Sequence, residues 1–554
     1  METGWKLVLS LTALACVWTS AQAPLFLFAG APAYIYNDIG GVDYWVWFVA
    51  AHLLATAAIS PFVGAISDLI GRRYIALAGS LCIMVGQVIC GFAHNMDTFI
   101  GGMAMTGVGT GINELTVIAG TSELVPISQR GYYLAAVTLT VAPYIPSVMY
   151  AQLIASRSTW RFIAVLTSGS ALIAFAMTFM FYSPRLPETA RRHSTVSERM
   201  ALVKKMDLFG GFLSISGLAL LEIGILGGGY RHPWTDAIVL APLVIGIALI
   251  MIFQVWELRF ATHPMIPRSL GQAPRTLLLT MIITFISGAN FFSVLMIWPS
   301  EAYNVYGHEP VGVGIRGLPF ACGTLAGCLI SLVLLSLLRG NIRWLLLGSS
   351  IVMTAGCGGL AAARVDNIHT VYGILFVAGL GVGGIVVPAS TVTTYICPPE
   401  LIATITSLTI AIRIVGGAVG YAVYFNIFVN KLKAELPALL IPACIKIGIT
   451  NKDEIGAVIG MTAESLIAEI RFLPSMRTKD DAAYQSIVEA GQLAYANAYP
   501  WVFYASIAFG AISILASLFL EDVSEFLNEK SVTPLGNLRE RGDLPGEDED
   551  SQRN

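Results

Sequence analysis

Charge is scarce in this 554-residue sequence: 12% of the residues are Asp, Glu, Lys or Arg, whereas 56% are hydrophobic. Soluble domains carry about 25% charged residues, so this chain has too little charge to cover a water-exposed surface. The mean hydropathy of +0.72 agrees with that conclusion. The composition argues against a soluble enzyme and indicates a polytopic membrane protein.

Other features are missing too. The 32 basic and 35 acidic residues nearly cancel, so nothing points to nucleic acid as a partner. Seven of the eight cysteines stand in or beside apolar runs without the spacing of metal ligands, and we expect neither a metal nor a cofactor. There is no Gly-x-x-x-x-Gly-Lys-Ser/Thr loop, which excludes a pump driven by nucleotide hydrolysis.

The sequence is instead dominated by long apolar runs. Bounded by charge, proline or glycine, they predict an all-α integral membrane protein with fourteen transmembrane helices in groups of six, two and six. The expected spans cover about 7–33, 43–66, 74–93, 97–119, 132–155, 162–182, 208–228, 237–255, 275–298, 311–338, 342–363, 370–396, 401–429 and 500–520.

These spans divide the chain into regions. We predict a six-helix bundle, a cytoplasmic linker, two extra helices with a cytoplasmic loop, a second six-helix bundle and an acidic cytoplasmic tail, at 1–182, 183–207, 208–274, 275–520 and 521–554. The second bundle includes an outer loop over 430–499, too polar for another span, on which short surface helices such as 464–472 are expected.

The N-terminal run imitates a cleavable signal peptide, because the small-residue triplet Ala21-Gln22-Ala23 follows Lys6 and an apolar stretch. Hydrophobicity continues past the triplet and Pro24 follows it directly, which favours a first transmembrane helix, with a cleaved signal as the alternative. Lys and Arg concentrate in the short segments that face the cytoplasm when the N-terminus is inside. Both termini of this multi-pass protein are therefore expected in the cytoplasm. The expected location is the plasma membrane, with a vacuolar or vesicular membrane as the alternative.

A motif occupies the turn between the second and third spans, where Gly64, Asp68, Gly71, Arg72 and Arg73 stand in the pattern G-x-x-x-D-x-x-G-R-R. It matches the signature of the major facilitator superfamily at every defining position. Glycine permits close helix approach and a sharp turn, and Asp68 can pair with basic groups in one state of a gate and release them in another. The alternative is an ordinary positively charged cytoplasmic loop.

Longer phrases resemble the fungal trichothecene efflux pump family, a fourteen-helix branch of that superfamily close to the siderophore transporters. They lie at 122–126, which contains Glu123, at 129–131, which contains Arg130, and at 286–292, 304–307, 314–319 and 412–417. The resemblance implies two six-helix bundles joined through two extra helices, gating residues that include Glu123 and Arg130, and export of a small organic molecule in exchange for protons. Met103 stands where drug exporters often carry an arginine linked to proton coupling, so that role does not transfer to this chain.

Ionisable groups at membrane depth are costly and mark transport pathways. Glu114, on a glycine-rich span, is the first candidate for a carboxylate that takes up and releases a proton. Arg413 stays charged and could bind an anionic group or act as the counter-ion of Glu114. For each residue the alternative is a structural hydrogen bond between helices.

Further candidates are weaker, because packing or a structural hydrogen bond explains each of them equally well or better. Arg316 is expected at an outer gate, and the others at the proton pathway or the substrate cavity: His52, Gln87, Asn113, Glu222, Asn290, Phe291 and Phe292.

Two transport functions therefore compete. The first is proton-coupled efflux of a toxin, secondary metabolite or drug, and the second is uptake of a ferric siderophore by the same fold. A membrane enzyme or receptor is disfavoured, because no nucleophile and base pair is visible in the apolar runs. The expected partners are a small-molecule substrate, protons and the lipid bilayer, with the chain acting as a monomer.

Overall fold

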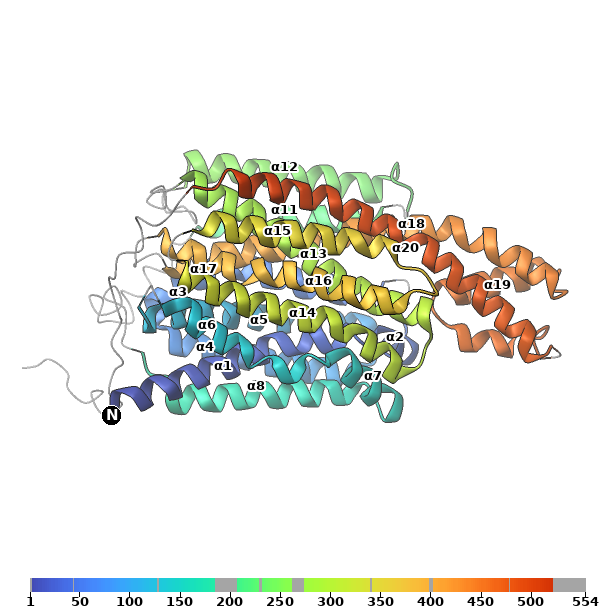
Figure 1. The fold of residues 1–554 in the computed structure, drawn as a ribbon, viewed down its shortest axis with the longest axis horizontal. Helices are drawn as coiled ribbons and strands as arrows, with labels where there is room; N and C mark the ends of the chain where they lie inside the picture. The colour runs from blue at the N-terminus through green and yellow to red at the C-terminus, as the bar shows by residue number, and fades with distance from the viewer. Residues whose placement is uncertain are drawn as a thin grey trace, which may run out of the picture.

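The computed structural model describes residues 2–42, 44–126, 129–184, 207–228, 232–261, 274–338, 341–397, 402–477 and 479–521. Long helices lie side by side along the length of the molecule (Figure 1). The predicted linker at 183–207 and the predicted tail at 521–554 lie almost entirely outside the described residues.

The first bundle has six helical segments, of which the fifth is broken. Pro143 and Pro146 lack the N–H that a helix interior needs, and the segment accordingly divides into α6, the short η2 and α7. The elements are α1 (Glu2–Phe28), α2 (Pro32–Ile39), α3 (Trp47–Ile70), α4 (Arg72–Gly91), α5 (Met96–Leu124), α6 (Arg130–Leu139), η2 (Ala142–Tyr144), α7 (Ser147–Arg157) and α8 (Arg161–Phe181).

The second bundle follows a helical hairpin of α11 and α12, and α11 packs against α3 and α18. Pro388 again divides one segment, into α16 and α17. The elements are α11 (Leu208–Gly227), α12 (Ala237–Arg259), α13 (Pro274–Tyr306), α14 (Pro310–Leu337), α15 (Ile342–Gly359), η4 (Leu360–Ala362), α16 (Ile368–Val386), α17 (Pro388–Tyr395), α18 (Ile402–Lys446), α19 (Lys452–Ala463), η6 (Ile467–Phe472) and α20 (Asp481–Leu518).

Within the described ranges, twelve helices are long and apolar enough to cross a membrane. The two other predicted spans, at 97–119 and 132–155, correspond to α5 and to the broken α6–η2–α7 segment. Most residues of α5 are buried. Because other helices rather than lipid surround it, α5 can hold many glycines and threonines and need not be strongly apolar.

The largest difference from expectation concerns residues 430–499, which we name the helical cap. α18 has 45 residues and α20 has 38, so they are about 67 and 57 Å long at 1.5 Å per residue, about twice the 30 Å of a bilayer core. With α19 they project beyond the ends of the other helices (Figure 1). The prediction of an outer loop is therefore corrected in part: residues 430–446 continue α18 and residues 481–499 belong to α20, whereas short helices of the expected kind are present as α19 and η6.

The two bundles meet along two seams, where α3 runs beside α18 and where α14 runs beside α6 and α7. The end of the molecule at which α3 meets α4 is called the motif end below, and the opposite end, from which the helical cap projects, is the cap end. Glu114 and Arg413, two of the functional candidates, lie between these seams.

Candidate functional site

A cavity of about 850 Å³ lies between the two bundles and is lined from both of them. Its wall is mostly apolar and aromatic, with Trp18 and Phe26 from α1 facing Phe291, Phe292 and Phe320 from α13 and α14. The rings of Phe26 and Phe291 meet edge to face with their centroids 6.3 Å apart, so the bundles touch through aromatic side chains here. This space is called the central cavity.

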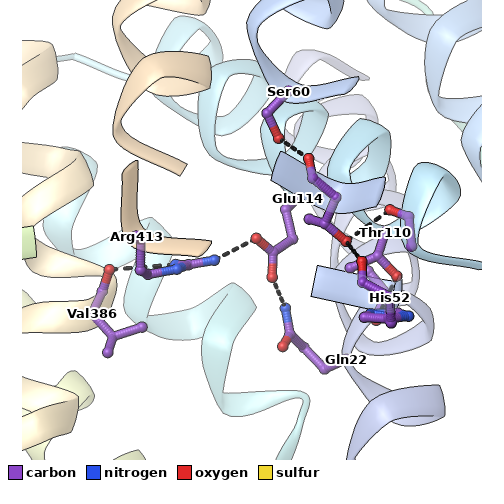
Figure 2. A network of polar contacts seen from close by, with 10 residues as sticks. Gln22, His52, Ser60, Thr110, Glu114, Val386 and Arg413 are labelled. Atoms are coloured by element: carbon purple, nitrogen blue, oxygen red, sulfur yellow. Dashed lines mark hydrogen bonds and ion pairs between the residues drawn. The ribbon is translucent and has the colours of Figure 1, made fainter. Parts of the chain in front are cut away.

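The central cavity has one ion pair in its wall, between Glu114 of α5 and Arg413 of α18 (Figure 2). The two side chains are 4% and 3% exposed. Gln22 of α1 donates a hydrogen bond of 2.5 Å to the other carboxylate oxygen of Glu114. Arg413 also donates to the carbonyl oxygen of Val386, at 3.4 Å. Three helices of the two bundles thereby converge on one carboxylate.

A glycine lets the helix of Arg413 lie close to α13. A Cβ atom at Gly288 would collide with the carbonyl oxygen of Arg413, so any larger residue there would push α13 and α18 apart. The backbone contact places the guanidinium at the depth of Glu114. Removing either partner of a buried pair leaves an uncompensated charge, which costs about 3–5 kcal/mol.

Of the predicted site residues, Glu114, Arg413, Phe291 and Phe292 come together in the wall of the central cavity. Three predicted amides do not line it, and each makes a hydrogen bond inside its own bundle. Asn113 donates to Ser80 at 3.2 Å, Gln87 donates to Thr106 at 3.0 Å, and Asn290 accepts from Tyr424 at 3.0 Å.

The other ionisable candidates are also outside the central cavity. His52 is buried in α3 and makes no contact with Glu114 in the network of Figure 2. Glu222 of α11 is fully buried, and neither carboxylate oxygen has a hydrogen-bond partner among the described residues. Arg316 donates to the carbonyl oxygens of Ala302 and Gly307, at 3.2 and 2.9 Å, and so satisfies the end of α13.

At the motif end, Gly71 separates α3 from α4 with a φ of +102°, a conformation that favours glycine. The next residue, Arg72, is buried and forms a two-point ion pair with Glu123 of α5, with one N–H···O distance of 2.5 Å. Arg73 donates to Ser183 at 3.2 Å. Gly64 is buried within α3, and the side chain of Asp68, with its predicted gating role, lies outside the described residues.

Arg130 connects the bundles at this end. It is 1% exposed and donates to the carbonyl oxygen of Ser122 at 2.8 Å within its own bundle. It also donates to the carbonyl oxygen of Thr394 in α17, at 3.0 Å. Glu123 and Arg130 therefore differ in what they connect. The ion pair of Arg72 and Glu123 joins two helices of the first bundle, whereas the hydrogen bond of Arg130 to Thr394 joins the two bundles.

Sequence reasoning missed Gln22 as a site residue. Gln22 stands between two alanines, a pattern that resembles a signal-peptide cleavage site. In the structure Gln22 lies within α1, and its amide donates a hydrogen bond to Glu114 of α5. A lone amide within an apolar run was the available signal, because polar groups at membrane depth usually face protein or water.

Known structures share this arrangement of helices. The proton:xylose symporter XylE of E. coli, a major facilitator superfamily protein, superposes with a TM-score of 0.55 at 11% identity, covering 96% of this chain and 98% of its own. The human organic anion transporter MFSD10 gives 0.54 at 10% identity, with 92% and 99% covered. The fold is thus that of the major facilitator superfamily, and curated relatives of this chain are also named MFS-type transporters.

Within this class the chain belongs to the fungal trichothecene efflux pump family, whose family model matches residues 3–548. The trichothecene efflux pump TRI12 of Fusarium sporotrichioides is 24% identical over 514 residues, which is 90% of this chain and 83% of that protein. The MFS-type efflux transporter ffsH of Aspergillus flavipes is 24% identical over 500 residues, with 89% and 82% covered.

Proposed function

We propose that this chain exports a small organic compound by alternating access and exchanges it for protons. The observation that carries the proposal is the ion pair of Glu114 and Arg413, because its two partners belong to different bundles and line the cavity between them. In a facilitator the two bundles tilt against each other around a midplane site. A charge pair across the seam makes that tilt depend on the charge of Glu114.

The proposed coupling follows from electrostatics. While Glu114 is ionised, its attraction to Arg413 holds α5 and α18 together. Binding of a proton to the carboxylate removes that attraction and leaves Arg413 with its hydrogen bond to the carbonyl oxygen of Val386. The bundles then separate more readily, so each proton taken up or released favours one state of the cycle.

The wall of the central cavity favours an apolar, ring-bearing cargo, because aromatic side chains from both bundles face it. Efflux rather than uptake is supported by the family and by relatives whose names state efflux. We further propose fourteen spans, with α5 and α6–η2–α7 completing the twelve apolar helices. The motif end and both termini face the cytoplasm of a plasma-membrane protein that acts as a monomer.

Transport by purified protein in lipid vesicles with an imposed pH gradient tests the proposal, with a trichothecene and a ferric siderophore as the two cargoes. Glu114→Gln should abolish gradient-driven trichothecene transport while exchange of labelled for unlabelled cargo continues. Glu222→Gln is the matched control, because that carboxyl is buried at membrane depth but lies outside the central cavity. Undiminished gradient-driven transport by Glu114→Gln overturns the coupling role, and accumulation of only the siderophore assigns the uptake function instead.

A further inference from the structure

A second, larger cavity lies nearer the cap end, with a volume of about 1540 Å³ that includes space open to solvent. We call it the outer chamber. It has no lining residue in common with the central cavity. Along α13 the two linings adjoin, since Leu295 lines the central cavity and Met296 lines the outer chamber. The two spaces are therefore neighbouring, separately lined parts of one path, and the outer chamber extends along α13 to Asn304.

The helical cap forms part of the wall of the outer chamber, through residues such as Glu464 and Tyr495. Tyr36 of α2 donates a hydrogen bond of 2.8 Å to the carbonyl oxygen of Glu464, which joins the first bundle to the cap. Tyr495 of α20 donates to the carbonyl oxygen of Thr462 at the end of α19, at 2.9 Å. Tyr36 thus ties the cap to the first bundle, and Tyr495 holds α19 against α20 within the cap.

The wall of the outer chamber is rich in aromatic rings from both bundles. Trp45 packs edge to face on Phe425, with centroids 6.2 Å apart. Phe428 and Tyr499 stack at 4.4 Å with their planes 17° apart. Flat aromatic faces of this kind bind ring systems well.

Two buried amides in the same wall have oxygens without a hydrogen-bond partner among the described residues, those of Gln152 and Asn304. Both residues are at most 5% exposed. Their amide nitrogens are engaged, because Gln152 donates to Gly30 at 2.6 Å and Asn304 donates to the carbonyl oxygen of Ser300 at 2.9 Å. These bonds orient the amides and leave two acceptors that a ligand O–H or N–H would satisfy.

The charge of the outer chamber is balanced. Among the described residues that line it, the charged ones are Lys433 and Glu464, one of each sign. Such a wall gives no net attraction to an anion or a cation.

We infer that the outer chamber is a second binding site, for an uncharged aromatic or polycyclic compound whose hydroxyl groups donate to Gln152 and Asn304. The inference goes beyond the proposed function, since binding at this site requires neither proton coupling nor a particular direction of transport. A compound can occupy the outer chamber while the ion pair of Glu114 and Arg413 is formed, because the two sites share no lining residue.

The test uses two probes of the same ring system, 2-naphthol and 2-methoxynaphthalene, of which only the first has an O–H to donate. Calorimetric titration of the full chain in lipid nanodiscs, with empty nanodiscs as blank, should show about fivefold tighter binding of 2-naphthol, the effect of one net hydrogen bond. Asn304→Leu and Gln152→Met should each reduce that preference. Phe26→Leu, in the wall of the central cavity, should leave it unchanged.

A second measurement locates the probe without the amide variants. A single cysteine at position 425 (Phe425→Cys, with the native cysteines replaced by serine) should react with a maleimide several times more slowly when 2-naphthol is present, and 2-methoxynaphthalene should protect less. Equal affinity for the two probes in the unchanged protein overturns the inference. So does a preference that survives both amide variants, or an absence of protection at position 425.

Discussion

Glu114 and Arg413 are 299 positions apart in the sequence, yet their side chains form a buried ion pair between α5 and α18. The pair exists only while the two bundles are close together at this depth. Under the proposed alternating access, the transport cycle would break and remake this contact.

Arg413→Gln should destabilise the protein by about 3 kcal/mol, because it leaves the buried carboxylate of Glu114 without its counter-ion. The double variant Glu114→Gln, Arg413→Gln has no buried charge at this place and should recover most of the lost stability, without recovering gradient-driven transport. Thermal unfolding of the purified proteins in detergent measures both effects. A double variant as unstable as the single one would contradict the pairing.

Arg130→Met should loosen the motif end, since it removes the hydrogen bond from α6 to the carbonyl oxygen of Thr394 in α17. Cys397, three residues further on, is half-buried and can report the opening. With Cys397 as the sole remaining cysteine, a membrane-impermeant maleimide should label Arg130→Met several times faster than the parent. Arg316→Met, whose contacts lie at the cap end, is the matched control and should leave the rate unchanged. Equal labelling of parent and Arg130→Met argues against a gate here.

Gly71→Ala should cost about 1–3 kcal/mol, because the φ of +102° at this turn is strained for any residue with a Cβ. Gly169→Ala in α8 serves as the control, since nothing lies within 4 Å of the added methyl group. The two unfolding midpoints in detergent make the comparison. If both substitutions behave alike, the turn does not require glycine.

The pair of Asp38 and Arg161 predicts a small effect of pH. Partial burial raises the pKa of Asp38, but hydrogen bonds from Arg161 and Trp160 outweigh it and keep the pKa below the usual 3.8. A lowered folded-state pKa stabilises the protein above pH 3.8, and the contribution disappears as the pH falls through the folded-state value. Asp38→Asn should therefore cost less than about 1 kcal/mol at pH 7, since the pair is partly exposed, and progressively less in acid. A stability difference that grows in acid would contradict this sign.

Most of the bundle could be predicted because bilayer thickness sets the length of apolar runs. The expected spans at 74–93 and 162–182 agree with α4 and α8 to within a few residues. The helical cap could not be predicted in the same way, because hydropathy stops marking a helix where the helix leaves the membrane. The part of α18 after residue 429 and the part of α20 before residue 500 were accordingly predicted as a loop.

The sequence could predict how deep each candidate residue lies in the membrane, but not towards which neighbouring helix its side chain points. Glu114 and Arg413 stand out because they are charged within apolar runs, and the structure brings them together. Gln87 and Asn113 lie on membrane-spanning helices as well, but their side chains point into the first bundle. Sequence position says how far a residue lies along a helix, and packing decides which way it faces.

The uninterrupted length of α18 makes this helix a lever. From Arg413 to Leu436, ahead of the prolines at 437 and 442, the helix is about 35 Å long. A tilt of about 10° at the ion pair would then carry the far end through about 6 Å by the same geometry. Neutralising the charge of Glu114 would thus move the helical cap by several ångströms, although Glu114 does not line the outer chamber beneath it.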